Sequence, residues 1–378
     1  FIMSEINASN FKKEHGDLAP DLVGVTELTS PYFFVPPSGN TAERPEDCEP
    51  GTLRFNTDHG TLEIFRGKTI GWEQIQRRDG QYLQGGTRGL FMGGSPNGNT
   101  NIDEITIPIL GSYVDFGDLT VGRHYCNATS SRVRAVNAGG VTPSGSDVID
   151  FVVFSQRGNA TDFGNLSTAR SSVGACANST RGLFMSGWNP YGTDPTDTIE
   201  YITIASEGNA VDFGNSTDGR AFGAGCQSSV RGIHAGGTTN GAPSYGTINT
   251  IDFVTIATTG NATDFGDLSA IRSHPGGASN ATRGLFCGGY VPGNLDVIDF
   301  ITIATLGNAI DFGNFISSGN GLAGVASPTR AVFGGAHPSP YNNYGFIEFA
   351  TTGNAQDFGD LSGNVGLGGA SNGHGGLA

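Results

Sequence analysis

The chain has 378 residues, of which 61 are glycine, and only 15% of its residues are charged. This composition fits neither a disordered acidic tail nor a helical protein, and it is typical of many short strands joined by tight turns. The formal net charge of −15 argues against binding to a phosphate backbone, which requires clustered lysine and arginine. We therefore expect no nucleic-acid partner.

The sequence also lacks the signals of a membrane or secreted protein. No stretch approaches the roughly 18 apolar residues of a membrane span, and the first ten residues carry no secretory pattern. We therefore expect no membrane span. Five cysteines, an odd number in so long a chain, do not suggest a disulfide framework. Cys176 and Cys226 occupy the same place in successive repeats, and we expect both to be buried free thiols.

The amino-terminal part of the chain differs from the remainder. Residues 1–30 are polar and show no clear periodicity, which predicts an extended arm. Residues 31–80 contain short strands bounded by proline, which predicts a small β-rich segment. The remaining residues, 81–378, form a separate domain built from repeats.

A single unit is repeated through this domain. The triplet Asp-Phe-Gly recurs six times at spacings of 46 to 52 residues. A period of this length matches either one four-stranded propeller blade or a pair of helices, and the glycine-rich turns and β-branched runs exclude the helices. We therefore predict an all-β protein, a β-propeller of six to seven four-stranded blades. The aspartates of the six triplets are Asp115, Asp162, Asp212, Asp264, Asp311 and Asp357.

One repeat shows the predicted blade. Val173–Ala177, Arg181–Gly187 and Ile199–Ala205 should form three strands, and Val211 should begin the fourth. The third strands are nearly continuous in apolar and β-branched residues, as expected of strands that neighbouring blades cover on both faces. The phenylalanine of each triplet should pack between blades. Its aspartate should bond turn amides or a nearby arginine.

The closure of the ring has two solutions. The hairpin of first and second strands appears seven times, ending with Val365–Ala378, whereas the hairpin of third and fourth strands appears six times. A seventh blade could be completed by Thr61–Arg66 and Gly71–Gln76 from the amino-terminal segment. We favour this strand exchange over a plain six-bladed ring. Both solutions leave only short, protected sheet edges.

The loops between second and third strands vary from 7 to 13 residues and should emerge on one rim of the ring. Exposed aromatic side chains on variable loops of a rigid scaffold are typical of a binding surface. A purely structural interpretation stays open, because loop variation costs little stability. The candidate receptor-binding residues are Trp188, Tyr191, Tyr245, Tyr290, His337, Tyr341 and Tyr344.

No catalytic or metal-binding motif interrupts the repeats. The seven histidines are scattered, and no His-Glu-x-x-His, Cys-x-x-Cys or Gly-x-Ser-x-Gly pattern organises them. The glycine-rich turns lack the strand-to-helix context that phosphate binding requires. We therefore predict no catalytic residue, no cofactor and no metal.

Two groups of motifs carry a family resemblance. The first lies in residues 87–372, in units such as Thr-Arg-Gly-Leu-Phe-Met-Gly-Gly from Thr87 and Gly-Asn-Ala-Thr-Asp-Phe-Gly-Asp-Leu-Ser from Gly260. The second is the run Pro36–Pro45, followed by Gly51–Thr57. The first group resembles kelch-like repeat virion proteins of marine tailed phages, especially those that infect cyanobacteria. The second is similar to a module at the start of phage tail and appendage proteins.

This resemblance implies a non-enzymatic virion structural protein with kelch-like blades, part of a tail fibre or of a capsid or tail appendage on the virion surface. Residues 31–80 would dock the chain to other virion proteins, and the propeller would face a host-surface glycan or protein. The protein would form a homo-oligomer. Two other interpretations stay open. One is a glycan-cleaving propeller enzyme, which needs two carboxylates roughly 5 to 10 Å apart. The other is an intracellular kelch-type interaction scaffold.

Overall fold

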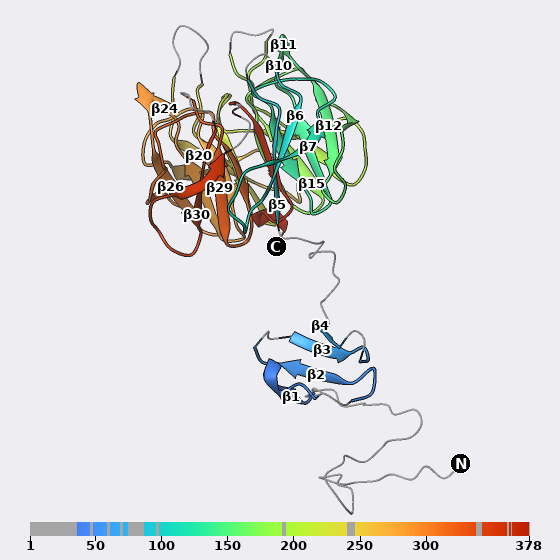
Figure 1. Cartoon of the computed structure of the whole chain (residues 1–378). Helices are drawn as coiled ribbons and strands as arrows, with labels where there is room; N and C mark the ends of the chain where they lie inside the picture. Colours follow the sequence, from blue (N-terminus) through green and yellow to red (C-terminus); the bar gives the residue numbers. More distant parts are fainter. Residues whose placement is uncertain are drawn as a thin grey trace, which may run out of the picture. The chain divides into compact units, whose positions relative to one another are not determined.

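The computed structural model describes residues 36–377, except 46–47, 59–60, 69–70, 75–86, 96–97, 191–193, 240–245, 338–341, 361–362 and 364. The chain divides into two units, Phe1–Asp79 and Gly80–Ala378 (Figure 1). The predicted arm over residues 1–30 lies outside the described residues. No helix in the described part of the chain is long and apolar enough to cross a membrane.

The first unit is a four-stranded sheet in the order β1-β2-β3-β4, in which β1 and β2 are parallel. A 3-10 turn, η1, precedes β2, and Asn40 caps it by accepting a hydrogen bond from the Glu43 amide. The elements are β1 (Ser38–Gly39), η1 (Thr41–Glu43), β2 (Leu53–Asn56), β3 (Thr61–Phe65) and β4 (Trp72–Gln74).

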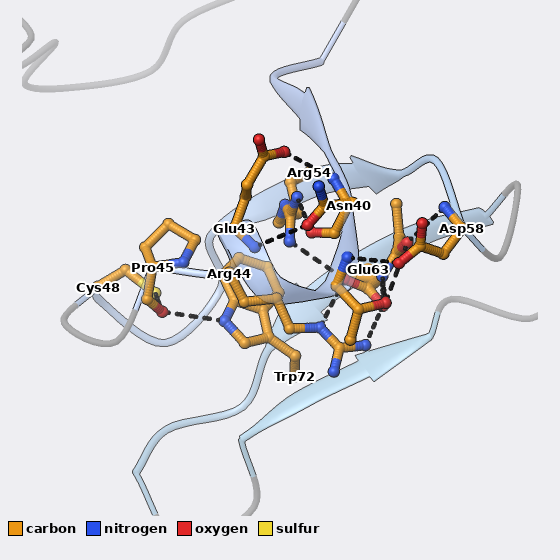
Figure 2. Close-up of polar contacts among 11 residues, drawn as sticks. Asn40, Glu43, Arg44, Pro45, Cys48, Arg54, Asp58, Glu63 and Trp72 are labelled. Carbon is orange, nitrogen blue, oxygen red and sulfur yellow. Dashed lines mark hydrogen bonds and ion pairs between the residues drawn. The ribbon is translucent and has the colours of Figure 1, made fainter.

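The covered face of this sheet carries a buried polar cluster beside the buried Phe65. Glu63 is fully buried and accepts hydrogen bonds from Arg44 and, at 2.8 Å, from Asn56 Nδ2. Arg54, which is 5% exposed, lies on the same face and donates from Nη2 to the Asn40 carbonyl at 3.0 Å (Figure 2). The hydrogen bond from Arg44 holds the pKa of the Glu63 carboxyl below its usual value. Paired charges and the Phe65 ring, which contacts Trp72 with 5.5 Å between centroids, therefore fill the interior of this unit.

The second unit contains six four-stranded antiparallel sheets, the blades, and the prediction of an all-β propeller is confirmed (Figure 1). The first, innermost strands are β8 (Asn127–Ser130), β14 (Gly174–Ala177), β18 (Ala224–Gln227), β22 (Gly276–Ser279), β28 (Ala323–Ala326) and β32 (Gly368–Ser371). The second strands are β5 (Arg88–Met92), β9 (Arg134–Ala138), β15 (Arg181–Met185), β19 (Arg231–Ala235), β23 (Arg283–Cys287) and β29 (Arg330–Gly334).

The third and fourth strands complete each blade. The third strands are β6 (Asn101–Thr106), β12 (Val148–Val153), β16 (Thr198–Thr203), β20 (Thr250–Thr255), β26 (Val297–Thr302) and β30 (Asn343–Glu348). The fourth strands are β7 (Val114–Asp118), β13 (Thr161–Asn165), β17 (Val211–Asn215), β21 (Thr263–Asp267), β27 (Ile310–Asn314) and β31 (Gln356–Asp360). The smaller elements are β10 (Val141–Thr142), β11 (Ser144–Gly145), β24 (Tyr290–Val291), β25 (Gly293–Asn294) and η2 (Gly375–Leu377).

The ring closes with six blades, which we number from the blade that contains β5. The inner strands contact one another in a closed cycle, from β8 through β14, β18, β22, β28 and β32 back to β8. The carboxyl-terminal strand β32 pairs antiparallel with β5 and so completes blade 1. With the sheet of the first unit, the described residues contain seven four-stranded sheets, of which six form the ring.

The predicted strand exchange with residues 61–66 and 71–76 is therefore wrong, and the plain six-bladed ring is correct. Strands β3 and β4 pair with each other in the sheet of the first unit. The count of seven hairpins has a simple cause. Strand β5, at the amino-terminal end of the repeats, has no first strand before it in the sequence. Strand β32, at the carboxyl-terminal end, has no second strand after it. These two strands pair with each other, so seven apparent hairpins in the sequence make six strand pairs in the ring.

The repeated Gly-Asn and Asp-Phe-Gly segments join neighbouring blades. Between blades 1 and 2, the Gly158 amide donates to the Phe116 carbonyl at 2.8 Å, and Asn159 Oδ1 accepts from the Asp118 amide at 3.1 Å. Gly117 has a φ of +150°, and a Cβ there would lie 2.3 Å from the Gly158 oxygen. The triplet therefore needs its glycine because the next blade's backbone occupies the place of a side chain. The same approach recurs at every junction.

The phenylalanine and the aspartate of the triplet have different outcomes. All six phenylalanines are buried between blades, as predicted; Phe116, for example, packs with Val152 and Phe154 of blade 2. The aspartates do not make the predicted bonds. All six are exposed, and the described residues include no hydrogen bond of their carboxylates. They lie on the outermost strand of each blade, where water solvates them.

The acid that binds arginine is instead the one on the third strand. Asp299 lies on the third strand of blade 5, and its Oδ2 accepts from Arg272 at 2.7 Å and from the amide and hydroxyl of Ser269 at 2.9 Å each. Both partners of the ion pair are fully buried. Equivalent buried pairs occur in blades 2, 3 and 4. They are Arg123 with Asp150, Arg170 with Glu200, and Arg220 with Asp252.

The close approach of blades at the triplet glycine can be tested with a matched pair of substitutions. Gly164 and Gly208 have nearly equal φ values, +146° and +151°, so alanine strains the backbone equally at both. A Cβ at Gly164 would lie 2.5 Å from the Gly208 oxygen, whereas a Cβ at Gly208 meets nothing within 4 Å. We expect Gly164→Ala to reduce the free energy of unfolding by about 1 to 3 kcal/mol more than Gly208→Ala, measured by urea denaturation. Equal losses would contradict this account of the junction.

Candidate functional site

Three of the predicted receptor-binding residues occupy one equivalent position in different blades. Trp188, Tyr290 and His337 begin the loop after the second strand, where each forms a β-bridge with the residue three positions before an inner strand. Trp188 is half-buried, whereas Tyr290 is 47% exposed and His337 is exposed. These side chains therefore lie on one face of the ring, here called the loop face. Tyr191, Tyr245 and Tyr341 lie outside the described residues.

Tyr344 is not an exposed loop residue, contrary to the prediction. It belongs to β30, is 1% exposed, and meets the ring of Phe91 edge-on with 4.8 Å between centroids. In the other five blades an isoleucine holds this place, and its side chain faces the core. Gly334, directly opposite on β29, makes room for the larger ring, since a Cβ there would lie 2.3 Å from it. The missing isoleucine made the strand resemble a loop.

A ring of six equivalent residues surrounds the channel mouth on the loop face. Each member precedes an inner strand, and its amide donates to the carbonyl of its counterpart in the preceding blade at 2.8 to 3.4 Å. The Tyr125 amide closes the circle by donating to Gly366 at 2.8 Å. The members, here called the mouth ring, have φ values of +52° to +72° and are Tyr125, Ser172, Phe222, His274, Gly321 and Gly366.

The backbone conformation of the mouth ring does not require the aromatic side chains that are found there. A left-handed backbone costs a residue other than glycine about 1 to 2 kcal/mol. Gly321 and Gly366 show that glycine fulfils the backbone role in two blades. The side chains of Tyr125, Phe222 and His274 are therefore retained at a cost in stability, and strained backbone of this kind is often found at functional sites.

The three ring systems form one cluster over the mouth. Phe222 and His274 are stacked with 3.8 Å between centroids, and Tyr125 meets Phe222 edge-on at 5.7 Å. Burial lowers the pKa of His274 to about 4, so the imidazole is neutral at pH 7. A hollow of ≈ 60 Å³ lies among these rings, and Ser172 and Gly321 also line it. The cluster therefore offers an uncharged, partly aromatic surface at the centre of the loop face.

Sequence reasoning missed this cluster. In four blades the mouth-ring residue stands two positions after the buried arginine, as in Arg123-His124-Tyr125 and Arg220-Ala221-Phe222. An alignment of these three-residue segments would have shown a constant arginine at the first position and a variable residue at the third. The left-handed backbone itself leaves no sequence signal where the residue is not glycine.

The channel behind the mouth is narrow. The inner strands approach so closely that a Cβ on Gly225 would lie 2.0 Å from the Ala175 oxygen. The cavity between them has ≈ 70 Å³, space for about two water molecules. Neither this cavity nor the hollow at the mouth has an aspartate or glutamate in its lining. Residues 373–377 cover the opposite mouth, where His374 Nε2 lies 2.8 Å from the Ser130 oxygen.

The cysteines and acids of the described residues do not form a metal centre. No group of three or more His, Cys, Asp or Glu side chains in that part of the chain could hold a metal ion. All five cysteines are free, and Cys176 and Cys226 are buried, as predicted. Burial raises the pKa of Cys176 to about 12, which makes it a weak nucleophile at pH 7.

No protein-family model and no curated protein matches this sequence. The structure itself defines the class of the chain, a six-bladed β-propeller with a separate amino-terminal sheet. Its candidate site is the loop face, with the mouth ring at the centre and Trp188, Tyr290 and His337 around it.

Buried imidazoles should make the propeller sensitive to acid. Burial lowers the pKa of both His274 and His374 to about 4, so the unfolded chain binds more protons than the folded chain between about pH 6.5 and pH 4. The contribution of these two histidines should be constant above about pH 7 and fall as the pH drops through this window, by about 3 kcal/mol at pH 4 for each histidine. Urea denaturation at a series of pH values measures this. His374→Gln should make the slope shallower, and an unchanged slope would contradict the assignment.

Proposed function

We propose that this chain is a non-enzymatic structural protein of a phage virion, part of a tail fibre or of a capsid or tail appendage. The first unit docks the chain to other virion proteins. The propeller displays its loop face toward a host-surface glycan or protein. The observation that carries the binding role is the mouth ring. Aromatic side chains occupy three of its positions, although Gly321 and Gly366 show that glycine can adopt the same backbone and make the same hydrogen bonds.

A rigid scaffold supports the display role. Second-strand arginines join each blade to the next, as where Arg231 lies 4.6 Å over the Phe253 ring and donates to the Ile303 carbonyl of blade 5 at 2.8 Å. Equivalent arginine contacts continue around the ring to Arg330, which donates to Ile107 of blade 1 at 3.3 Å. A face held by such contacts meets a ligand without large rearrangement, which reduces the entropic cost of binding.

The faces of the amino-terminal sheet support the docking role. Side chains alternate along a strand, so Arg54 and Glu63 lie on the covered face and the neighbouring positions lie on the other. That other face is mostly apolar, with Glu73 opposite Ile64 on β4. Its leucines are exposed in the described residues, Leu53 by 42% and Leu62 by 39%. Phe55, paired with Leu62, continues this face. Neighbouring apolar side chains exposed on one face of a sheet are expected where another protein covers that face.

The docking role predicts a change in virion incorporation. Replacing Leu53 and Leu62 together with glutamate places two charges on the apolar face and should remove the chain from purified particles, as measured by mass spectrometry. The control is Leu110→Glu, which changes a still more exposed leucine (56%) on the propeller and should leave incorporation unchanged. If the wild-type chain is abundant in infected cells but absent from particles, the virion role is wrong and an intracellular scaffold is favoured.

A further inference from the structure

We infer that the hollow in the mouth ring is a binding site for one uncharged sugar residue of a surface glycan. The sugar would pack a C–H face over the rings of Tyr125 and Phe222 and would hydrogen-bond to the Ser172 hydroxyl. The proposed function supplies the biological setting for this inference, but the site is argued from its own residues.

The Ser172 hydroxyl lacks a partner in the described part of the chain. Ser172 is 8% exposed and lines the hollow, yet its Oγ makes no hydrogen bond. A buried hydroxyl without a partner costs about 1 to 3 kcal/mol. It also stands on left-handed backbone, with a φ of +57°, where glycine would be less strained. A ligand that brings a hydroxyl or a carbonyl oxygen into the hollow would satisfy this group.

The lining of the hollow favours a neutral ligand. No charged side chain lines it, although the chain has 35 acidic residues. The nearest buried cations, such as Arg123 and Arg272, are paired with Asp150 and Asp299 inside their own blades. A phosphate or a carboxylate would find no free counter-charge among the residues that line the hollow. A neutral group therefore fits this lining best.

The aromatic cluster favours a ligand that has both apolar and polar sides. The aromatic rings provide apolar area and electron-rich faces that attract C–H groups, whereas Ser172 demands a polar partner. A leucine or phenylalanine side chain from a protein partner would contact the rings and leave the hydroxyl unpaired. A sugar satisfies both, since its ring carries a C–H face and hydroxyl groups.

The size of the hollow defines what enters it. Its ≈ 60 Å³ is about two water volumes, enough for a hydroxymethyl or an acetamido methyl group but not for a whole pyranose. The sugar ring would therefore lie across the mouth with one substituent inserted. Tyr290 stands beside the mouth, because Ser273, its β-bridge partner, directly precedes His274. It is placed to contact the adjoining sugar of a longer glycan.

The test uses the full chain on an array of neutral and acidic glycans, followed by calorimetric titration of the best neutral ligand. Phe222→Gly installs the residue that Gly321 and Gly366 already provide in the same ring, so the fold should be retained. Ser172→Ala removes only the hydroxyl. Each variant should weaken binding at least about tenfold, equivalent to about 1.4 kcal/mol. The control is Tyr113→Ala, which removes an aromatic ring (38% exposed) from the hairpin at the opposite end of blade 1.

The outcomes separate this inference from the proposed function. Absence of neutral-glycan binding, or equal binding by both variants and the wild type, overturns the sugar site, even if mass spectrometry places the chain in virions. Glycan binding that both variants weaken supports the site, even if the chain is absent from virions. Binding to host cells that survives periodate oxidation of their surface sugars would identify a protein as the occupant and contradict the inference.

Discussion

The pairing of β32 with β5 joins residues about 280 positions apart in the sequence, and the closure of the propeller depends on it. Each blade buries its apolar faces only against its two neighbours, so an open row of blades would expose one face at each end. With β32 in place, the first blade is complete and the sixth has a partner. The apolar side chains of blades 1 and 6, such as Phe91 and Val325, then share one core.

Three cycles of polar contacts follow from this closure, at different distances from the axis. The mouth ring of amide-to-carbonyl bonds is innermost, the arginine contacts lie between the second strands and the next blade, and the Gly-Asn contacts join the outer strands. The mouth ring and the arginine contacts run through all six junctions, and the Gly-Asn contacts run through five. At the junction of blades 6 and 1, serine follows Gly111, and the Gly111 amide donates to the Phe358 carbonyl at 3.1 Å. The residues that the repeats hold constant are therefore explained by the joining of blades. Functional information lies where the repeats differ, at Tyr125, Phe222 and His274 and in the loops around them.

Much of the fold could be predicted from the sequence because the turns are well marked. The four strands of blade 3 begin within one residue of their predicted starts, since Asn-Ser-Thr and Gly-Asn-Ala fix the turns on either side. The burial of the triplet phenylalanine followed from its apolar character. Closure was predicted wrongly because the sequence gives the number of hairpins but not which halves pair over a long separation.

The candidate site was harder to predict for a physical reason. An exposed tyrosine and a buried one differ by their surroundings, and Tyr344 is buried only because Gly334 leaves space beside it. The mouth ring depends on left-handed backbone at Tyr125, Phe222 and His274, residues that rarely adopt it. The position of Trp188 and Tyr290 on one face did follow from the repeat, because equivalent loops of a ring share a rim.

The position of β5 within its sheet determines how the propeller would bear a mechanical load. The chain enters the ring at Arg88, the first residue of β5, and this strand is hydrogen-bonded to β32 on one side and to β6 on the other. A pull transmitted from the amino-terminal side would act on a strand clamped from both sides rather than on an edge strand that peels away one bond at a time. Two ladders would have to break together before the first blade yielded.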